Sequence, residues 1–405
     1  MILDGVRVLD FTQYLAGPVV TRLMAEMGAE IIKVEQGPNG DPTRILPIVK
    51  NGRSAYFVQQ SLGKKSLCLD LAQPESQAII DGLVAECDVV VENFSKRIAD
   101  KRKLDYASLA KINPRIIVAS VSAFGRDSPY ANKTGYDWIA QGFTGVMHMT
   151  GPKDGKPHPV GIGIADSNAG VHAFSAIGYA LYYREKTGKG QYLDISMVDA
   201  LYHMNEITVQ GYQASDGAYV PMRAGEHHAL VCPCGVYKSA EGYMVLLVLQ
   251  NQWPGLCAAM GRTDLTNDVR FASQDVRAKN QAELIPIIEA WLQTFDSDAK
   301  AWACLEEHRV PSGPVLSPQD TIDHEYYRGR GAIRTVHDPI VGKLDLPGFP
   351  LRFSEQTEYA PGAAPNLGEH NREILKAVLG YDEARISALT DKGVLLSKKD
   401  CVVVT

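Results

Sequence analysis

The chain has 405 residues, of which 45% are hydrophobic and 22% are charged, so it can bury a large core and is not expected to be disordered. A net charge of −6 argues against nucleic acid or an anionic membrane as the main partner. No charged-then-apolar leader opens the chain, and its most apolar run, residues 244–249, is too short to span a bilayer. These features predict a soluble cytoplasmic protein.

The first third of the chain alternates predicted strands and helices. The strands are expected at residues 6–11, 30–34, 66–71, 88–91 and 115–121, and the helices at 18–27, 74–85 and 106–112. Such alternation, with apolar β-branched strands, predicts a Rossmann-like parallel sheet that is covered on both faces. The turn after the first strand lacks G-x-G-x-x-G, so a nicotinamide-dependent dehydrogenase is only a distant alternative.

Asp166 is the most informative single residue. It lies between the small-residue turn at 161–165 and a mostly apolar helical run at 171–181. Free backbone N–H groups and the positive end of the helix dipole converge at a helix start, and they are expected to hold this carboxylate ionised. Such a carboxylate suits a nucleophile. The alternative is that Asp166 or Ser167 only caps the helix.

The second half of the chain predicts a smaller α+β region. Strands are expected near 235–238 and 243–249, and helices at 283–292 and 299–308. After residue 325 the chain is rich in loops, and it ends in a helix that begins near 368. The seven cysteines are scattered and odd in number, which suits reduced thiols. The one close pair, Cys232 and Cys234, has no second pair at zinc spacing, so no metal site is predicted.

Eight stretches, in order along nearly the whole chain, resemble the class III CoA-transferases, a family that includes formyl-CoA transferase and the carnitine-type enzymes. They are LDFTQYLAGP (9–18), GAEIIKVE (28–35), VENF (91–94), GYD (135–137), ADSN (165–168), KTGKGQ (186–191), SGPV (312–315) and LGEH (367–370).

The resemblance implies an interlocked homodimer in which both chain termini build the large domain. The large domain would comprise residues 1–200, completed by 330–405 through a return segment that starts at 326. A linker at 201–225 and a small α+β domain at 226–325 would lie between these parts.

The resemblance also implies that Asp166 is the nucleophile that carries CoA from an acyl-CoA donor to a carboxylic acid acceptor. An aspartyl mixed anhydride and an aspartyl-CoA thioester would form in turn. Backbone N–H groups beside Asp166 are expected to stabilise the oxyanions. CoA or acyl-CoA is then the substrate, small carboxylic acids are the other partners, and no tightly bound cofactor is expected.

Other site residues carry over from the family motifs. Gln13 and Tyr136 match active-site residues, whereas Asn93 and Phe94 match residues that line the CoA pocket. Taken alone, Gln13 is equally well a polar turn residue, whereas the core is the favoured place for Phe94. A core tyrosine with a satisfied hydroxyl is the usual alternative for Tyr136. Asp137 is either a second acid near the site or the N-cap of the helix that follows it.

The phosphates of CoA require local cations on this acidic chain. Lys101 matches a phosphate-contacting arginine of the family, and Lys65, Leu69 and Arg44 are further candidates for CoA binding. Many relatives place an arginine after the stretch at 28–35, but this chain has Gln36 there. Arg44 is expected to replace that charge.

A second departure concerns the middle domain, where formyl-CoA transferase has a glycine-rich loop. The comparable segment here, residues 223–229, offers Arg223, His227 and His228. This segment argues against an oxalate or formyl specificity and suggests that these side chains bind a larger acid. A core or capping role is the alternative for at least one of the histidines.

Two rival functions remain. A racemase of the same family would abstract an α-proton from an acyl-CoA and would carry histidine where this chain has Tyr136, and tyrosine is a poor base near neutral pH. A non-catalytic CoA-binding protein would not need Asp166. The sequence favours a CoA-transferase.

Overall fold

A computed structural model describes residues 1–356, 359 and 362–398 of the chain. It divides into two compact units. Unit 1 comprises residues 1–145, 160–209 and the described residues from 325 onward, and unit 2 comprises residues 146–159 and 210–324. Residues 146–159 and 210–225 therefore cluster with the smaller unit, whereas the sequence analysis places them in the large domain and the linker.

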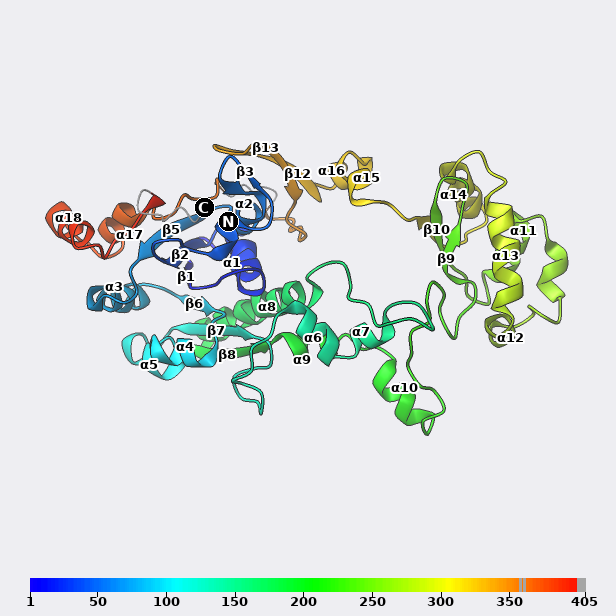
Figure 1. Ribbon diagram of the computed structural model, residues 1–405, viewed down its shortest axis with the longest axis horizontal. Coiled ribbons are helices and arrows are strands. Elements are labelled where there is room, and N and C mark those ends of the chain that lie inside the picture. The colour runs from blue at the N-terminus through cyan, green and yellow to red at the C-terminus, as the bar shows by residue number, and fades with distance from the viewer. Residues whose placement is uncertain (357–358, 360–361, 399–405) are drawn as a thin grey trace. The chain divides into compact units, whose positions relative to one another are not determined.

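Unit 1 is built on a six-stranded sheet with the order β5-β2-β1-β6-β7-β8, and every adjacent pair is parallel (Figure 1). Its strands are β1 (Arg7–Asp10), β2 (Glu30–Gln36), β5 (Lys64–Leu69), β6 (Val89–Glu92), β7 (Ile117–Ser122) and β8 (Gln191–Ser196). The predicted α/β class with a parallel sheet is confirmed. The edge strand β8 was not predicted, because its polar and apolar residues alternate over too short a run.

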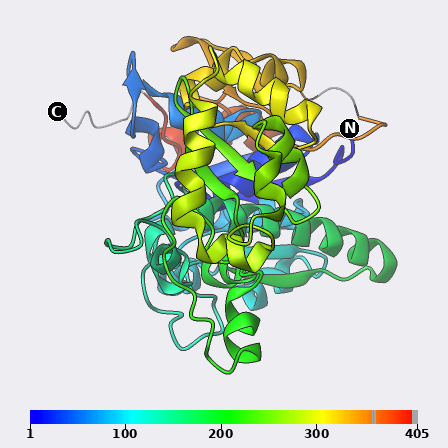
Figure 2. The same ribbon diagram turned by 90° about the vertical axis from the view of Figure 1, so that its right-hand side faces the viewer.

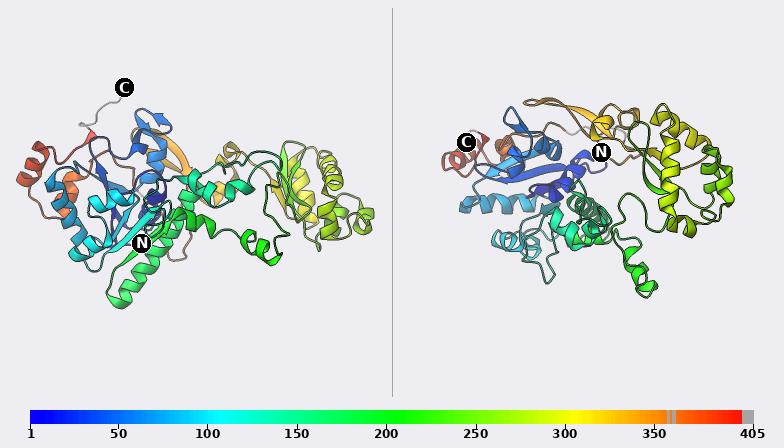
Figure 3. Two further views of the ribbon diagram at one scale, coloured as in Figure 1. Left: turned by 60° about the horizontal axis from the view of Figure 1, so that its bottom comes forward. Right: turned by 45° about the vertical axis from the view of Figure 1, so that its right-hand side comes forward.

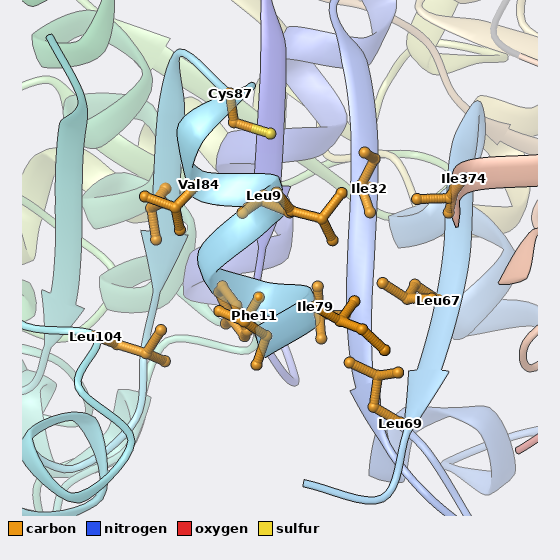
Figure 4. Close-up of a cluster of buried hydrophobic side chains, with 14 of the residues drawn as sticks. Leu9, Phe11, Ile32, Leu67, Leu69, Ile79, Val84, Cys87, Leu104 and Ile374 are labelled. Carbon is orange, nitrogen blue, oxygen red and sulfur yellow. The ribbon is translucent and has the colours of Figure 1, made fainter. Parts of the chain in front are cut away.

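Both faces of this sheet are covered. Leu9 and Ile32 point to one face, where they pack with Ile79 of α3 (Pro74–Ala85) (Figure 4). Val8 and Ile31 alternate with them and are fully buried on the other face. Helix α1 (Ala16–Glu26) packs against β1, β2 and β6, and the long helix α8 (Ile164–Thr187) packs against α1, β7 and β8 (Figure 3).

The C-terminal part of the chain completes unit 1. Helix α17 (Asn371–Ala377) packs against β5, and its Ile374 joins the buried cluster (Figure 4). The hairpin of β12 (Ile333–Asp338) and β13 (Gly342–Pro347) precedes it, and α18 (Glu383–Asp391) follows it. Two helices thus stand where the sequence predicted one.

Short elements fill the rest of unit 1. They are η1 (Pro42–Ile45), β3 (Val49–Lys50), β4 (Arg53–Ser54), α2 (Ala55–Ser61), α4 (Lys96–Lys101), α5 (Tyr106–Ile112), α6 (Asp137–Phe143), α9 (Met197–Tyr202) and α16 (Glu325–Gly329). Helix α10 (Thr208–Ala214) spans the boundary between the two units.

Unit 2 has a three-stranded antiparallel sheet with helices packed beside it (Figure 2). Met244 and Leu246 point into its core with Trp253, whereas Tyr243 and Val245 on the other face are exposed. Its elements are α7 (Val146–Met149), β9 (Cys234–Lys238), β10 (Tyr243–Leu247), α11 (Trp253–Ala259), η2 (Thr263–Asn267), α12 (Gln274–Lys279), α13 (Gln281–Leu292), α14 (Asp298–Glu307), β11 (Ser312–Pro314) and α15 (Pro318–Ile322).

Three further observations concern the described residues only. None of their helices is both long enough and apolar enough to cross a membrane. No group of three or more His, Cys, Asp or Glu side chains among them is arranged to hold a metal ion. Their six cysteines are free thiols, and Cys401 lies outside the described residues.

Candidate active site

Between β1 and β6, the order in which the chain adds strands to the sheet reverses. The chain runs from β1 to β2 and β5 on one side, and then returns to β6, β7 and β8 on the other. In open α/β sheets, ligands bind in the crevice outside the strands at such a point. Gln13 follows β1, and Asn93 and Phe94 follow β6, so the sheet brings these three predicted residues to one edge.

Asn93 fixes the loop that carries Gln13. Its Oδ1 accepts the backbone N–H of Gln13 at 2.8 Å, and its Nδ2 donates to the Gln13 carbonyl oxygen at 2.8 Å. The neighbouring Gly17 is required, because a Cβ there would lie 2.4 Å from Thr12 Cγ2. Both ends of the Asn93 amide are thus engaged, whereas the Gln13 side chain makes no hydrogen bond to the described residues. The half-buried Phe94 packs against the core of unit 1.

Asp166 lies in the first turn of α8, but the N–H groups at this helix start do not serve its carboxylate. The backbone N–H groups of Ala165 and Asp166 donate to Oδ1 of Asp137, at 2.7 and 3.2 Å. The N–H of Ser167 donates to the Gly163 carbonyl oxygen. The expectation that these groups hold Asp166 ionised or stabilise oxyanions is therefore wrong, and neither Asp166 nor Ser167 caps the helix.

Asp137 provides that cap from another helix. It is only 7% exposed, and its Oδ2 accepts a hydrogen bond from Gln141 Nε2 at 2.5 Å. It stands in the first turn of α6, where Tyr136 is the N-cap residue, so Asp137 is not the cap of its own helix. The sequence pointed to Asp137, but the helix that it caps could be found only from the tertiary structure.

The environment of Asp166 favours its neutral form. Burial, and then the negative charge of Asp137, raise the pKa of Asp166 to about 7. This carboxyl group therefore takes up and releases a proton near neutral pH. The predicted direction was the opposite, because the sequence did not reveal a second carboxylate at the same helix start.

Tyrosines surround this part of unit 1. Tyr136 is 65% exposed, and its ring stands edge-on to that of Tyr14 with the centroids 6.0 Å apart. The hydroxyl of Tyr56 donates to the Tyr14 carbonyl oxygen at 3.3 Å. Burial, and then the charge of Asp166, raise the pKa of Tyr56, so its hydroxyl stays protonated and lies within the field of Asp166. Sequence reasoning missed Tyr56, because nothing local distinguishes it from a core residue.

Two of the predicted phosphate-binding cations are already paired with carboxylates of the chain. Arg44 donates to both carboxylate oxygens of Glu35, at 2.6 and 2.8 Å, and its guanidinium lies 4.0 Å from the Phe57 ring centroid. Lys65 lies near the amino-terminal end of β5, and its ammonium group forms ion pairs with Glu30 and Glu373. The acids that pair with Lys65 are distant from it in sequence, whereas Glu35 lies on β2 nine residues before Arg44.

The other predicted CoA-binding residues of unit 1 lie at the carboxyl edge of the sheet. Leu69 ends β5, and its side chain is fully buried in the core. Lys101 is the last residue of α4, and it is exposed and lines a small cavity with Phe11 and Arg102.

Arg223, His227 and His228 belong to unit 2. Nη1 of Arg223 donates to the His148 carbonyl oxygen at 2.7 Å, its Nε has no partner, and no carboxylate of the described residues pairs with it. The ring of His227 packs edge-on against Tyr237, and burial lowers the pKa of His227. Nδ1 of His228 accepts two backbone N–H groups at 3.1 Å, so His228 caps a turn.

Comparison with known proteins places the chain in a family. A sequence model described as CoA-transferase family III matches residues 3–371. The chain belongs to CoA-transferase family III. It is 34% identical to the mouse (Mus musculus) succinyl-CoA:glutarate CoA-transferase, over 97% of this chain and 90% of that one. It is 36% identical to the Haloarcula hispanica succinyl-CoA:mesaconate CoA-transferase, over 96% and 98%.

A solved structure agrees with this assignment. The crystal structure of a CAIB/BAIF family protein from Brucella suis is similar to this chain with a TM-score of 0.82 and 33% identity. The similarity covers 93% of this chain and 99% of that one. The family assignment and the α/β fold are therefore supported along nearly the whole chain.

Proposed function

We propose that this family III enzyme transfers CoA through covalent intermediates on Asp166. A carboxylate oxygen of Asp166 attacks the donor thioester carbon, the C–S bond breaks, and CoA leaves as a thiolate, which yields a mixed anhydride. The thiolate then attacks the Asp166 carbonyl carbon, the anhydride C–O bond breaks, and the donor acid leaves. The acceptor carboxylate reverses both steps and restores the Asp166 carboxylate.

The observation that carries this proposal is the half-buried carboxyl group of Asp166, which lies at the start of α8 beside Asp137 and within the field of Tyr56. Tyr56 contacts Tyr14, the residue after Gln13, and the Tyr14 ring packs against Tyr136. Burial removes water that would hydrolyse an anhydride or a thioester. We assign the free amide of Gln13 and the exposed hydroxyl of Tyr136 to bind acyl oxygens. The N–H groups at the start of α8 are already bonded to Asp137, so side chains take the role expected of them.

For the substrates, we propose succinyl-CoA as donor and a dicarboxylic acid as acceptor. Both relatives named above are succinyl-CoA-dependent enzymes, with glutarate or mesaconate as the other substrate. Arg223 is the proposed ligand of the second carboxylate, because its guanidinium has no carboxylate partner within the described residues. His227 and His228 are engaged in packing and turn formation, which leaves Arg223 as the more available group.

We also propose the interlocked homodimer that the family resemblance implies. Helix α8 packs its small residues against the rest of unit 1. On its other side, it exposes Val171, Tyr179, Tyr182 and Tyr183. A helix that is apolar on opposite faces is one that a partner covers. Light scattering should give about twice the 44.2 kDa of one chain. A mass of one chain at micromolar concentration would contradict the dimer.

The transfer proposal predicts that Asp166→Asn lowers exchange of labelled CoA into succinyl-CoA by about 10³-fold or more, because an amide is not a competent nucleophile. Asp199→Asn removes an exposed carboxylate from α9 and is the matched control, with exchange expected unchanged. If Asp166→Asn exchanged labelled CoA as fast as the unaltered protein, Asp166 would not be the nucleophile. Deuterium entry at the α-carbon without CoA exchange would instead indicate a racemase.

The pKa of Asp166 predicts a pH dependence. Since only the ionised carboxylate attacks, kcat/KM should rise with pH to a plateau through a limb near pH 7. Asp137→Asn removes the neighbouring charge but keeps an oxygen that accepts the α8 N–H groups. The limb should therefore move to lower pH, since the pKa of Asp166 falls. Asp127→Asn, which removes an exposed carboxylate on a loop, should leave the limb at the pH of the unaltered protein. An unmoved limb in Asp137→Asn would disprove the coupling.

A further inference from the structure

The loop after β1 has a strained main chain. Tyr14 follows Gln13 in this loop, and its φ of 63° lies in the left-handed region, which a bulky side chain rarely permits. Such a conformation costs free energy, so it persists only where the surrounding contacts fix it, and strain of this kind is concentrated at functional sites. The contacts that fix this loop therefore also determine where Gln13 stands.

Side chains hold both ends of the peptide bond between Thr12 and Gln13. Nζ of Lys33 donates to the Thr12 carbonyl oxygen at 2.7 Å. On the opposite side of the same peptide plane, Oδ1 of Asn93 accepts the Gln13 N–H at 2.8 Å. Because the peptide unit is planar, it cannot turn without losing one of these two hydrogen bonds. Lys33 and Asn93 together thus set the orientation of the peptide that leads into Gln13.

Lys33 makes this contact from inside the fold. It lies on β2 beside Asp10 of β1, and only 1% of its surface is exposed. Its ammonium group also lies 2.9 Å from Oδ2 of Asp41. Burial lowers the pKa of Lys33, but nearby carboxylates, chiefly that of Asp41, raise it above its usual value. The lysine is therefore charged, and a hydrogen bond from a charged donor to the Thr12 carbonyl is stronger than one from a neutral donor.

A second buried lysine nearby balances charge without touching this loop. Lys64 lies 2.9 Å from Oδ2 of Asp10, and it donates to the Thr21 hydroxyl at 2.7 Å and to the Pro18 carbonyl oxygen at 3.4 Å. Among the described residues it makes no hydrogen bond to residues 12–14. Balancing the buried carboxylates therefore does not require a contact with the loop, and the bond from Lys33 to the loop is an additional feature.

We propose that Lys33 is a positioning residue of the transfer reaction, which holds the Thr12–Gln13 peptide so that the Gln13 amide meets the acyl oxygen. This inference rests on the proposed function in one respect, the assignment of Gln13 to an acyl oxygen. Lys33 is buried beneath the loop and acts on the reaction only through this peptide. A displaced amide would stabilise the oxyanion of the transition state less, with little change in substrate binding, so the effect of Lys33 belongs to kcat.

The test is a double-mutant cycle between Lys33→Met and Gln13→Ala in the full chain, with kcat and the KM for succinyl-CoA as readouts. Methionine keeps most of the apolar stem of lysine but cannot donate to the Thr12 carbonyl. Lys33→Met should lower kcat about tenfold while KM stays within about twofold, and Gln13→Ala should lower kcat about 10²-fold. In the Gln13→Ala background, Lys33→Met should lower kcat by less than about twofold further, because no amide is left to position.

Two further variants separate this role from a contribution to folding. Asp41→Asn removes the charge beside Lys33 but leaves the bond from Lys33 to the Thr12 carbonyl. Its amide oxygen can still accept the N–H and the hydroxyl of Thr43, as Oδ1 of Asp41 does at 2.9 and 2.8 Å. This matched control should keep kcat within about twofold. Lys33→Met/Asp41→Asn removes both partners of the ion pair and leaves neither of them unpaired, so it repeats the test if Lys33→Met alone does not fold, as judged by circular dichroism.

Three results would overturn the inference while covalent transfer on Asp166 stands. They are an unchanged kcat in the folded Lys33 variants, an equal loss of kcat from Lys33→Met with and without Gln13, and an equal loss in Asp41→Asn. Failure of both Lys33 variants to fold would also overturn it, since Lys33 would then serve the fold alone. An unchanged kcat in Gln13→Ala would remove the role proposed for Gln13 and this inference with it. Only the Asp166→Asn exchange experiment decides the nucleophile, so the two failures are distinguishable.

Discussion

The carboxylate of Asp137 determines how the candidate active site is built. It is buried, it comes from α6, and it accepts two backbone N–H groups from the first turn of α8. These bonds fix the start of the helix that carries Asp166, and the charge of Asp137 disfavours a second charge beside it. One side chain therefore sets both the position of Asp166 and the pH at which it ionises. Without that cap, α8 would begin with unsatisfied N–H groups in a buried place.

The same arrangement recurs at the loop that follows β1. Asn93 holds the Gln13 backbone through two hydrogen bonds, as Asp137 holds the start of α8. In both places the polar side chain makes its hydrogen bonds to the main chain. The residue next to it in the sequence stays at least partly accessible: Phe94, after Asn93, is half-buried, and Tyr136, before Asp137, is exposed. The groups that are free to meet a substrate are thus carried on main-chain segments of fixed conformation, which favours catalysis by pre-organised groups.

The sequence predicts the elements of this fold better than their contacts. Apolar runs locate five strands of the sheet, whereas the alternating β8 escapes such a pattern. The sequence also locates the start of α8, but not the acid that takes its N–H groups, because Asp137 is far from Ala165 in sequence. Arg44 and Lys65 likewise looked available for phosphate, since their partners Glu35 and Glu373 are brought to them only by folding. Tyr56 had no local signal at all.

In the proposed mechanism, Asp166 forms a mixed anhydride and then a CoA thioester during turnover. The direct measurement is peptide mass spectrometry after incubation with succinyl-CoA and quenching with hydroxylamine, which converts an activated aspartyl carbonyl to a hydroxamate. We expect a hydroxamate on Asp166 only when succinyl-CoA is present, and none at this position in the Asp166→Asn protein. Sustained CoA transfer with no modification of Asp166 would contradict it.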